Sequence, residues 1–136
     1  MNTPTKNEYM LFFRGTDWTK GLSPEEIQTV MGQWKSWFEG LVNDGQAKSG
    51  KPLERAGKVV SGKNGRVVAD GPFAESKEAI GGYFLLDVAS LEAAVAIAKG
   101  CPGLEYGAIV EVRPVAQMCP CAQESLAEAE LAHATA

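Results

Sequence analysis

The sequence predicts an α+β domain in which two helices cover one face of an antiparallel sheet. Three observations lead to this fold class: short apolar runs typical of strands, two longer segments with apolar residues at helical spacing, and turn signals between them. The chain has 136 residues, of which 45% are hydrophobic and 22% charged. That length allows one hydrophobic core, and no linker or repeat divides it, so residues 1–136 are interpreted as one domain.

The first part of the chain predicts a strand followed by a long helix. Residues 8–14, EYMLFFR, are short, aromatic-rich and followed by a glycine. Ser23 can cap the helix, Pro24 suits its first position and Glu26 completes a capping box. Asn43-Asp44-Gly45 then ends it. One apolar stripe runs along this helix and makes a core or pocket wall: Ile27, Val30, Met31, Trp34, Phe38, Leu41 and Val42.

The middle of the chain predicts a loop, a hairpin and a strand. Residues 46–57 contain Gly, Lys and Pro, which indicates a loop with room for a short edge strand. Residues 58–61 and 66–70 are expected to pair around Asn64-Gly65, since both positions of such a tight turn favour positive φ. Residues 82–88 form the next strand.

The last part predicts a second helix, a final strand and a tail. Ser90 caps the helix SLEAAVAIAK, which Gly100 and Pro102 end. Residues 107–115 form the strand, and the Ala- and Glu-rich tail is expected to be a short helix or frayed. The order β-α-β-β-β-α-β is similar to a ferredoxin-like βαββαβ sandwich with an extra hairpin strand.

Both faces of the predicted sheet carry apolar side chains. Because side chains alternate along a strand, Leu11 and Phe13 share one face and Met10 and Phe12 share the other. Two helices cover only one face, and a solvated face would be more polar. We therefore expect a homodimer packed sheet to sheet around a small-molecule cavity. The alternative is a monomer whose C-terminal tail covers the second face.

Asp70 is the candidate catalytic residue. Asp70 and Val68 are two residues apart on the same strand, so their side chains point to the same face. We therefore expect Asp70 at the mouth of the inter-sheet cavity. Desolvation there would raise the pKa of its carboxyl group and suit it to acid/base chemistry. The alternative is an Asx-type turn in which Asp70 accepts hydrogen bonds from the backbone after Gly71-Pro72.

Arg14, Tyr83 and Glu111 are candidate ligand-binding residues on that same face. The planar guanidinium of Arg14 suits a carboxylate or phenolate, and the alternative is a salt bridge from Arg14 to Glu111 or Asp87. Tyr83 could donate a hydrogen bond to a ligand or fill the dimer core.

Two further candidates follow the Asp70-Gly71-Pro72 bend. Phe73 is expected to fold back as a lid or wall of the cavity. Lys77 lies on its rim, where the alternative is an ordinary solvated charge. Gly81-Gly82 allows backbone or ligand to approach closely.

Composition argues against several classes of protein. The formal net charge of -4 does not attract nucleic acid or an anionic membrane. We see no secretion signal and no apolar run that could span a membrane, so the expected compartment is the cytoplasm. The cysteines Cys101, Cys119 and Cys121 are interpreted as reduced thiols. A single Cys-x-Cys with the distant His133 is a weak metal signal, so we expect neither a metal nor a cofactor.

Three segments together resemble a known family. They are ADGPFAESKEAIGGYFLLDV, SLEAAVAIAKGCP and GAIVEVRPV, preceded by EYMLFFRG. Residues 8–116 resemble the YCII-related family in its DGPF-containing branch, with 117–136 as a tail. The resemblance implies a dimeric α/β barrel, kinship with muconolactone isomerase-like proteins, and genes that often neighbour those of alternative sigma factors.

The resemblance also implies an active site built on a His–Asp pair in shorter members of the family. Here the first helix contains no histidine and His133 lies in the tail, so Asp70 alone carries over. Two functions follow. One is a cofactor-independent enzyme acting on a small aromatic or lactone-like substrate. The other is a non-catalytic small-ligand binding or regulatory module linked to a sigma-factor system.

Overall fold

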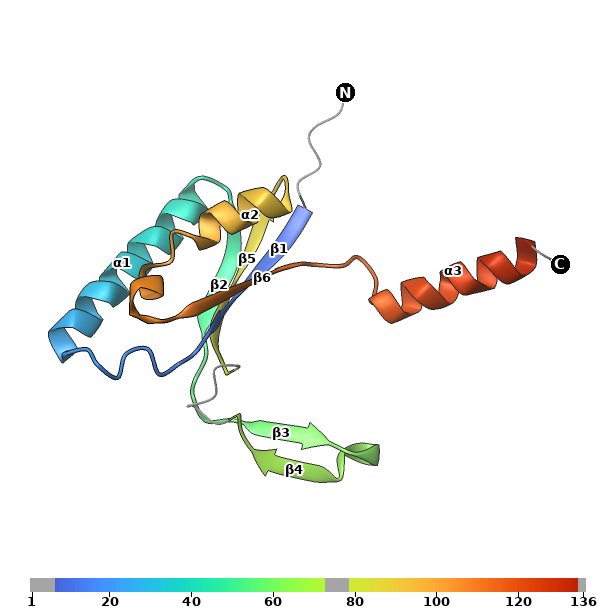
Figure 1. The fold of residues 1–136 in the computed structure, drawn as a ribbon, viewed down its shortest axis with the longest axis horizontal. Helices are drawn as coiled ribbons and strands as arrows, with labels where there is room; N and C mark the ends of the chain where they lie inside the picture. The colour runs from blue at the N-terminus through green and yellow to red at the C-terminus, as the bar shows by residue number, and fades with distance from the viewer. Residues whose placement is uncertain (1–6, 73–78, 135–136) are drawn as a thin grey trace.

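The computed structural model describes residues 7–72 and 79–134 and shows an α+β fold with a four-stranded antiparallel sheet. The strand order is β2-β5-β1-β6, and α1 and α2 pack on one face of the sheet (Figure 1). The sheet consists of β1 (Asn7–Arg14), β2 (Ala47–Pro52), β5 (Ile80–Val88) and β6 (Ile109–Pro114). The helices are α1 (Pro24–Asn43), α2 (Leu91–Ala98) and α3 (Pro120–Ala134), with short 3₁₀ turns η1 (Lys63–Gly65) and η2 (Pro102–Tyr106).

The predicted helix starts are confirmed in atomic detail. The Ser23 hydroxyl accepts a hydrogen bond from the Glu26 amide at 3.1 Å, and the Glu26 carboxylate accepts one from the Ser23 amide at 2.9 Å. Ser90 caps α2 through a 3.1 Å hydrogen bond from the Ala93 amide. Both caps satisfy amides that a helix start leaves without partners.

The predicted hairpin exists, but it lies outside the main sheet. β3 (Lys58–Ser61) and β4 (Val67–Asp70) form a separate two-stranded sheet that extends from the body (Figure 1). Asn64 and Gly65 adopt the expected positive φ values of 60° and 66°, but the connection is longer than a tight turn, because the last paired residues are Ser61 and Val67 and η1 lies between them. The strand that pairs with β5 is instead β2, from the segment interpreted mainly as a loop. Its Lys, Gly and Pro residues are typical of an edge strand.

The core lies between the sheet and the two helices, as the alternation predicted. Leu11 and Leu86 are fully buried there, and Val30 of α1 is almost fully buried. On the opposite face Met10, Phe12 and their neighbours are only half-buried. α3 extends away from the body rather than across this face (Figure 1), so the alternative of a covering tail is not what the structure shows.

Two exposed glycines inside α1 offer a test of local helix stability. An added Cβ at Gly32 or Gly40 would meet nothing within 4 Å, and neither glycine has a positive φ. Since alanine loses less backbone entropy, Gly32→Ala and Gly40→Ala should each raise the free energy of unfolding by about 1 kcal/mol. Urea denaturation measures the gain. An unchanged or lower midpoint in both variants would contradict this account of α1.

Candidate functional site

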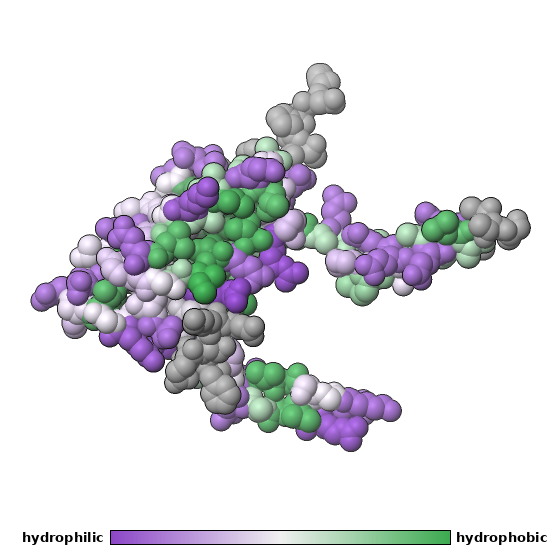
Figure 2. Space-filling model, in the orientation of Figure 1, coloured by the Kyte–Doolittle hydropathy of each residue, from purple (hydrophilic) through white to green (hydrophobic). Residues whose placement is uncertain are grey.

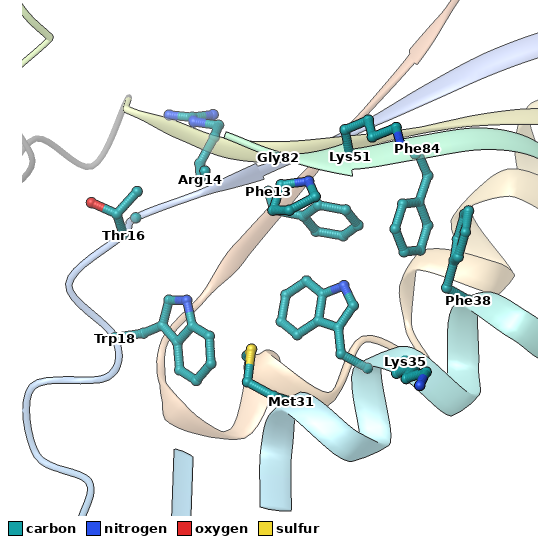
Figure 3. Close-up of a pocket in the computed structure, with 15 residues that line it drawn as sticks. Phe13, Arg14, Thr16, Trp18, Met31, Lys35, Phe38, Lys51, Gly82 and Phe84 are labelled. Atoms are coloured by element: carbon teal, nitrogen blue, oxygen red, sulfur yellow. The ribbon is translucent and has the colours of Figure 1, made fainter. Parts of the chain in front are cut away.

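A cavity of about 450 Å³ opens between α1 and the sheet. Its walls come from the end of β1 and the loop after it, from one side of α1, and from β2 and β5 (Figure 3). The lining is Phe13, Arg14, Gly15, Thr16, Trp18, Met31, Trp34, Lys35, Phe38, Gly50, Lys51, Pro52, Gly81, Gly82 and Phe84. A concave, mainly apolar space of this size is typical of small-molecule sites.

Aromatic rings form most of the wall and hold one another in place. Phe13 meets Trp34 edge to face with centroids 4.9 Å apart, and it meets Phe84 in the same way at 4.7 Å. Trp18 stacks on Trp34 at 5.9 Å, and Phe38 packs on Phe84 at 4.6 Å. These offset and edge contacts are the favoured arrangements of aromatic pairs, so the wall is fixed before any ligand enters.

Glycines let strand β2 and the rings of the wall approach closely. A Cβ on Gly50 would lie 2.6 Å from Phe84 Cδ1 and 2.9 Å from Phe38 Cε1. A Cβ on Gly82 would lie 2.9 Å from the Lys51 carbonyl oxygen. The close approach predicted for Gly81-Gly82 is therefore made, at Gly82, by the neighbouring strand β2.

One lysine stands at the edge of this aromatic wall: Lys35, from α1 (Figure 3). It is exposed, and among the described residues no carboxylate pairs with it. Lys51 of β2 pairs with Tyr83 of the helix-free face, so it lines the cavity without its ammonium group, which points to the other side of the sheet (Figure 3). The cavity therefore combines an apolar, aromatic interior with positive charge at its edge.

Arg14 lines the cavity with its stem only. Its guanidinium points to the other side of the sheet (Figure 3) and lies 3.3 Å from a Glu111 carboxylate oxygen. Of the two roles considered for Arg14, the structure shows the salt bridge to Glu111. Tyr83 and Glu111 belong to the helix-free face, so neither lines this cavity.

Asp70 does not occupy the place that the sequence suggested. It ends β4 in the projecting hairpin, where its carboxylate pairs with Lys58, and its side chain is 88% exposed. The expectation that Asp70 points into the helix-free face was wrong, because β4 is not a strand of that sheet. The burial that the acid/base hypothesis needs is absent. Phe73 and Lys77 lie outside the described residues.

The cysteines fall into two environments. Cys101 is buried, and this burial raises the pKa of its thiol to about 11. Cys119 and Cys121 are exposed with their sulfur atoms 2.8 Å apart, and the hydrogen bond from Cys121 lowers the pKa of the Cys119 thiol. Within the described ranges, no three Cys, His, Asp or Glu residues are arranged to hold a metal ion.

Sequence comparisons give the family of the chain. A search of the curated proteins finds no match. No helix in the described part of the chain has the length and hydropathy needed to cross a membrane. The family model of the YCII-related domain matches residues 9–128, which include every strand of the main sheet except the first two residues of β1, and every residue that lines the cavity. The chain therefore belongs to the YCII-related domain family.

Proposed function

We propose that this protein binds a small molecule with an aromatic body and an anionic group in the cavity between α1 and the sheet. One observation supports this most strongly: a preorganised aromatic wall stands beside Lys35, a cation without a carboxylate partner in the described chain. Rings favour stacked and edge contacts with other rings, and an ammonium group attracts a carboxylate, phenolate or phosphate.

The two parts of the cavity recognise two parts of the ligand. Trp18, Trp34 and Phe84 present ring faces and edges to a planar body. Lys35 then fixes its orientation by holding the charged group near the cavity edge. This combination favours an aromatic carboxylate or phenolate over a neutral lipid or a sugar.

Binding fits the cavity better than catalysis does. Its described lining contains no Asp, Glu, His, Cys or Tyr side chain. General acid/base catalysis most often uses one of these groups, within hydrogen-bond reach of the substrate, and the lysine at the cavity edge, Lys35, is exposed rather than buried in an apolar pocket. Asp70 lies in the hairpin, paired with Lys58, and is not part of the lining. Of the two functions expected from the sequence, a non-catalytic ligand-binding module is therefore favoured, and its association with a sigma factor stays a hypothesis.

We further propose that two copies pack through their helix-free faces. The strand order β6-β1-β5-β2 and the two crossing helices fit a ferredoxin-like sandwich, the subunit of a dimeric α/β barrel. Phe12 pairs with Tyr83 on one side, and Met10 pairs with Leu85, so apolar groups form continuous rows across this half-buried face. A two-fold partner would cover these rows.

Thermal denaturation with 2-naphthoate, benzoate and neutral naphthalene-methanol tests the binding proposal. We expect 2-naphthoate to raise the melting temperature most, since a ligand that binds only the folded state stabilises it. Lys35→Gln should weaken binding of 2-naphthoate by roughly tenfold and leave binding of the neutral alcohol unchanged.

Lys99→Gln is the matched control, because Lys99 is exposed and does not line the cavity. It removes the same single charge and should bind 2-naphthoate as the unmodified protein does. Equal losses in Lys35→Gln and Lys99→Gln would mean that net charge alone attracts the anion. Absence of stabilisation by any of the three probes at millimolar concentration would refute the proposed ligand class.

A further inference from the structure

Two elements stand apart from the packed body of the chain. The β3–β4 hairpin and α3 both extend on the side away from α1, with open space between them (Figure 1). Neither makes an extensive contact with another described helix or strand. A two-stranded hairpin alone is marginally stable in water, and most helices depend on tertiary packing for their stability. Packing against a partner would therefore stabilise both elements.

The hairpin presents apolar side chains to solvent on both faces. Val60 and Val68 lie directly opposite each other and are 62% and 60% exposed. Val59 and Val67, on the other face, are about half exposed. Figure 2 shows this hydrophobic patch on the hairpin, separate from the apolar surface of the body. Exposed apolar groups gathered in this way mark an interaction surface.

The charges of the two elements are complementary. Lys63 and Arg66 lie at the turn of the hairpin, and within the described residues neither has a carboxylate partner. α3 contains no lysine or arginine, and Glu124 and Glu128 lie on the same side of it as Leu131, which is 66% exposed. The acidic residues of α3 are Glu124, Glu128 and Glu130. One element thus offers cations and valines, and the other offers carboxylates and leucine.

The attachment points of the two elements place them at opposite ends of the sheet. The hairpin leaves the sheet near Ile80, which pairs with Arg14 at the end of β1. α3 follows Pro114, which pairs with Tyr9 near the start of β1. Tyr9 and Arg14 are five residues apart, so these points are separated by about 17 Å along β1. A face-to-face dimer with its two-fold axis perpendicular to the strands brings the hairpin end of one copy beside the α3 end of the other.

We propose that the β3–β4 hairpin of each copy binds α3 of a second copy, so that two equal clasps hold the dimer together. This proposal rests on the proposed sheet-to-sheet dimer and extends it. In each clasp Lys63 and Arg66 face Glu124 and Glu128, and one valine face of the hairpin packs against the side of α3 that these glutamates share with Leu131. The occupant of both surfaces is a second copy of this chain.

Charge reversal tests the clasp, with the association of the full chain measured by sedimentation equilibrium. Lys63→Glu/Arg66→Glu reverses the hairpin and Glu124→Lys/Glu128→Lys reverses α3. The dimer dissociation constant of each variant alone should be at least roughly tenfold higher than that of the unmodified chain, because each variant places like charges together in both clasps. An equal mixture of the two variants should form heterodimers of near-normal affinity, because opposite charges meet in both clasps.

Matched controls change the net charge by the same amounts on the body of the protein. They are Lys20→Glu/Lys99→Glu and Glu39→Lys/Glu105→Lys, four exposed residues outside the hairpin and α3. Both controls should dimerise as the unmodified chain does. Because the reversed residues are exposed, all variants should keep the circular dichroism spectrum and the 2-naphthoate binding of the unmodified chain.

The outcomes separate the clasp from the other proposals. If the unmodified chain is monomeric at tens of micromolar, both the clasp and the sheet-to-sheet dimer are overturned. The ligand-binding proposal does not depend on this result, because thermal denaturation tests it separately. A dimer that tolerates both charge reversals would overturn the clasp alone. Carbodiimide crosslinking of mixed light and ¹⁵N-labelled chains gives a second readout. Crosslinks from Lys63 to Glu124 or Glu128 should join two chains, and crosslinks found only within one chain would contradict the clasp.

Discussion

Replacing Leu86 with alanine is expected to lower the free energy of unfolding by about 2–5 kcal/mol, the range for a fully buried leucine. Leu86 has no exposed surface and lies in the middle of β5, between strands β1 and β2. Its side chain faces α1 and α2 as part of the core. The close packing there leaves the missing methyl groups as a void, which adds to the lost transfer free energy.

Leu104→Ala is the control for this prediction. Leu104 lies in η2 and is 40% exposed, so its truncation should cost less than about 1 kcal/mol. Denaturant titrations of both variants, with the slope compared as well as the midpoint, measure the difference. Equal losses in the two variants would contradict the assignment of the core to the helix-covered face.

Replacing Gly50 with alanine is expected to destabilise the protein by about 1–3 kcal/mol and to weaken ligand binding. The added methyl group would lie 2.6 Å from Phe84 and 2.9 Å from both Phe38 and the Tyr83 carbonyl oxygen. The carbonyl belongs to the neighbouring strand, so part of the clash can be relieved only by moving backbone. The remainder pushes the two rings toward the cavity and reduces its volume.

A double-mutant cycle with Phe84→Leu identifies the clash as the cause. A smaller side chain at position 84 makes room for the methyl group, so the cost of Gly50→Ala should fall in the Phe84→Leu background. Gly40→Ala is the matched control, because its Cβ meets nothing within 4 Å and it should stabilise rather than destabilise. Additive effects of Gly50→Ala and Phe84→Leu would contradict the geometry described for this wall.

Local sequence signals predicted the parts of the fold that depend on local physics. The Ser23 and Ser90 caps, the Asn64-Gly65 turn and the alternation along β1 are each decided by a few neighbouring residues, and the structure confirms them. The identity of the outer strand depends on long-range pairing instead. β2 has a Lys- and Gly-containing sequence without an apolar period, whereas the valines of the hairpin have a strand-like pattern but pair only with each other.

The candidate site was harder to predict for the same reason. The apolar stripe of α1 identified Trp34 and Phe38 as core or pocket wall, which the cavity lining confirms. Trp18 lies in a loop without periodicity, and Lys35 resembles any solvated lysine in sequence. The sequence predicted the position of Asp70 from the alternation of side chains along its strand. That alternation assigns a residue to a face of the main sheet only if its strand belongs to that sheet, and β4 belongs to the separate hairpin.

Amide NMR of the ¹⁵N-labelled protein titrated with 2-naphthoate tests the central claim most directly, namely that the cavity between α1 and the sheet is the ligand site. The account predicts saturable shifts of the Gly50 and Gly82 amides and of the Trp18 and Trp34 indole N–H signals. Signals of Glu111 and Arg113, on the helix-free face, should remain unchanged. Saturable shifts confined to Glu111, Arg113 and their neighbours, with the four cavity signals unmoved, would contradict it.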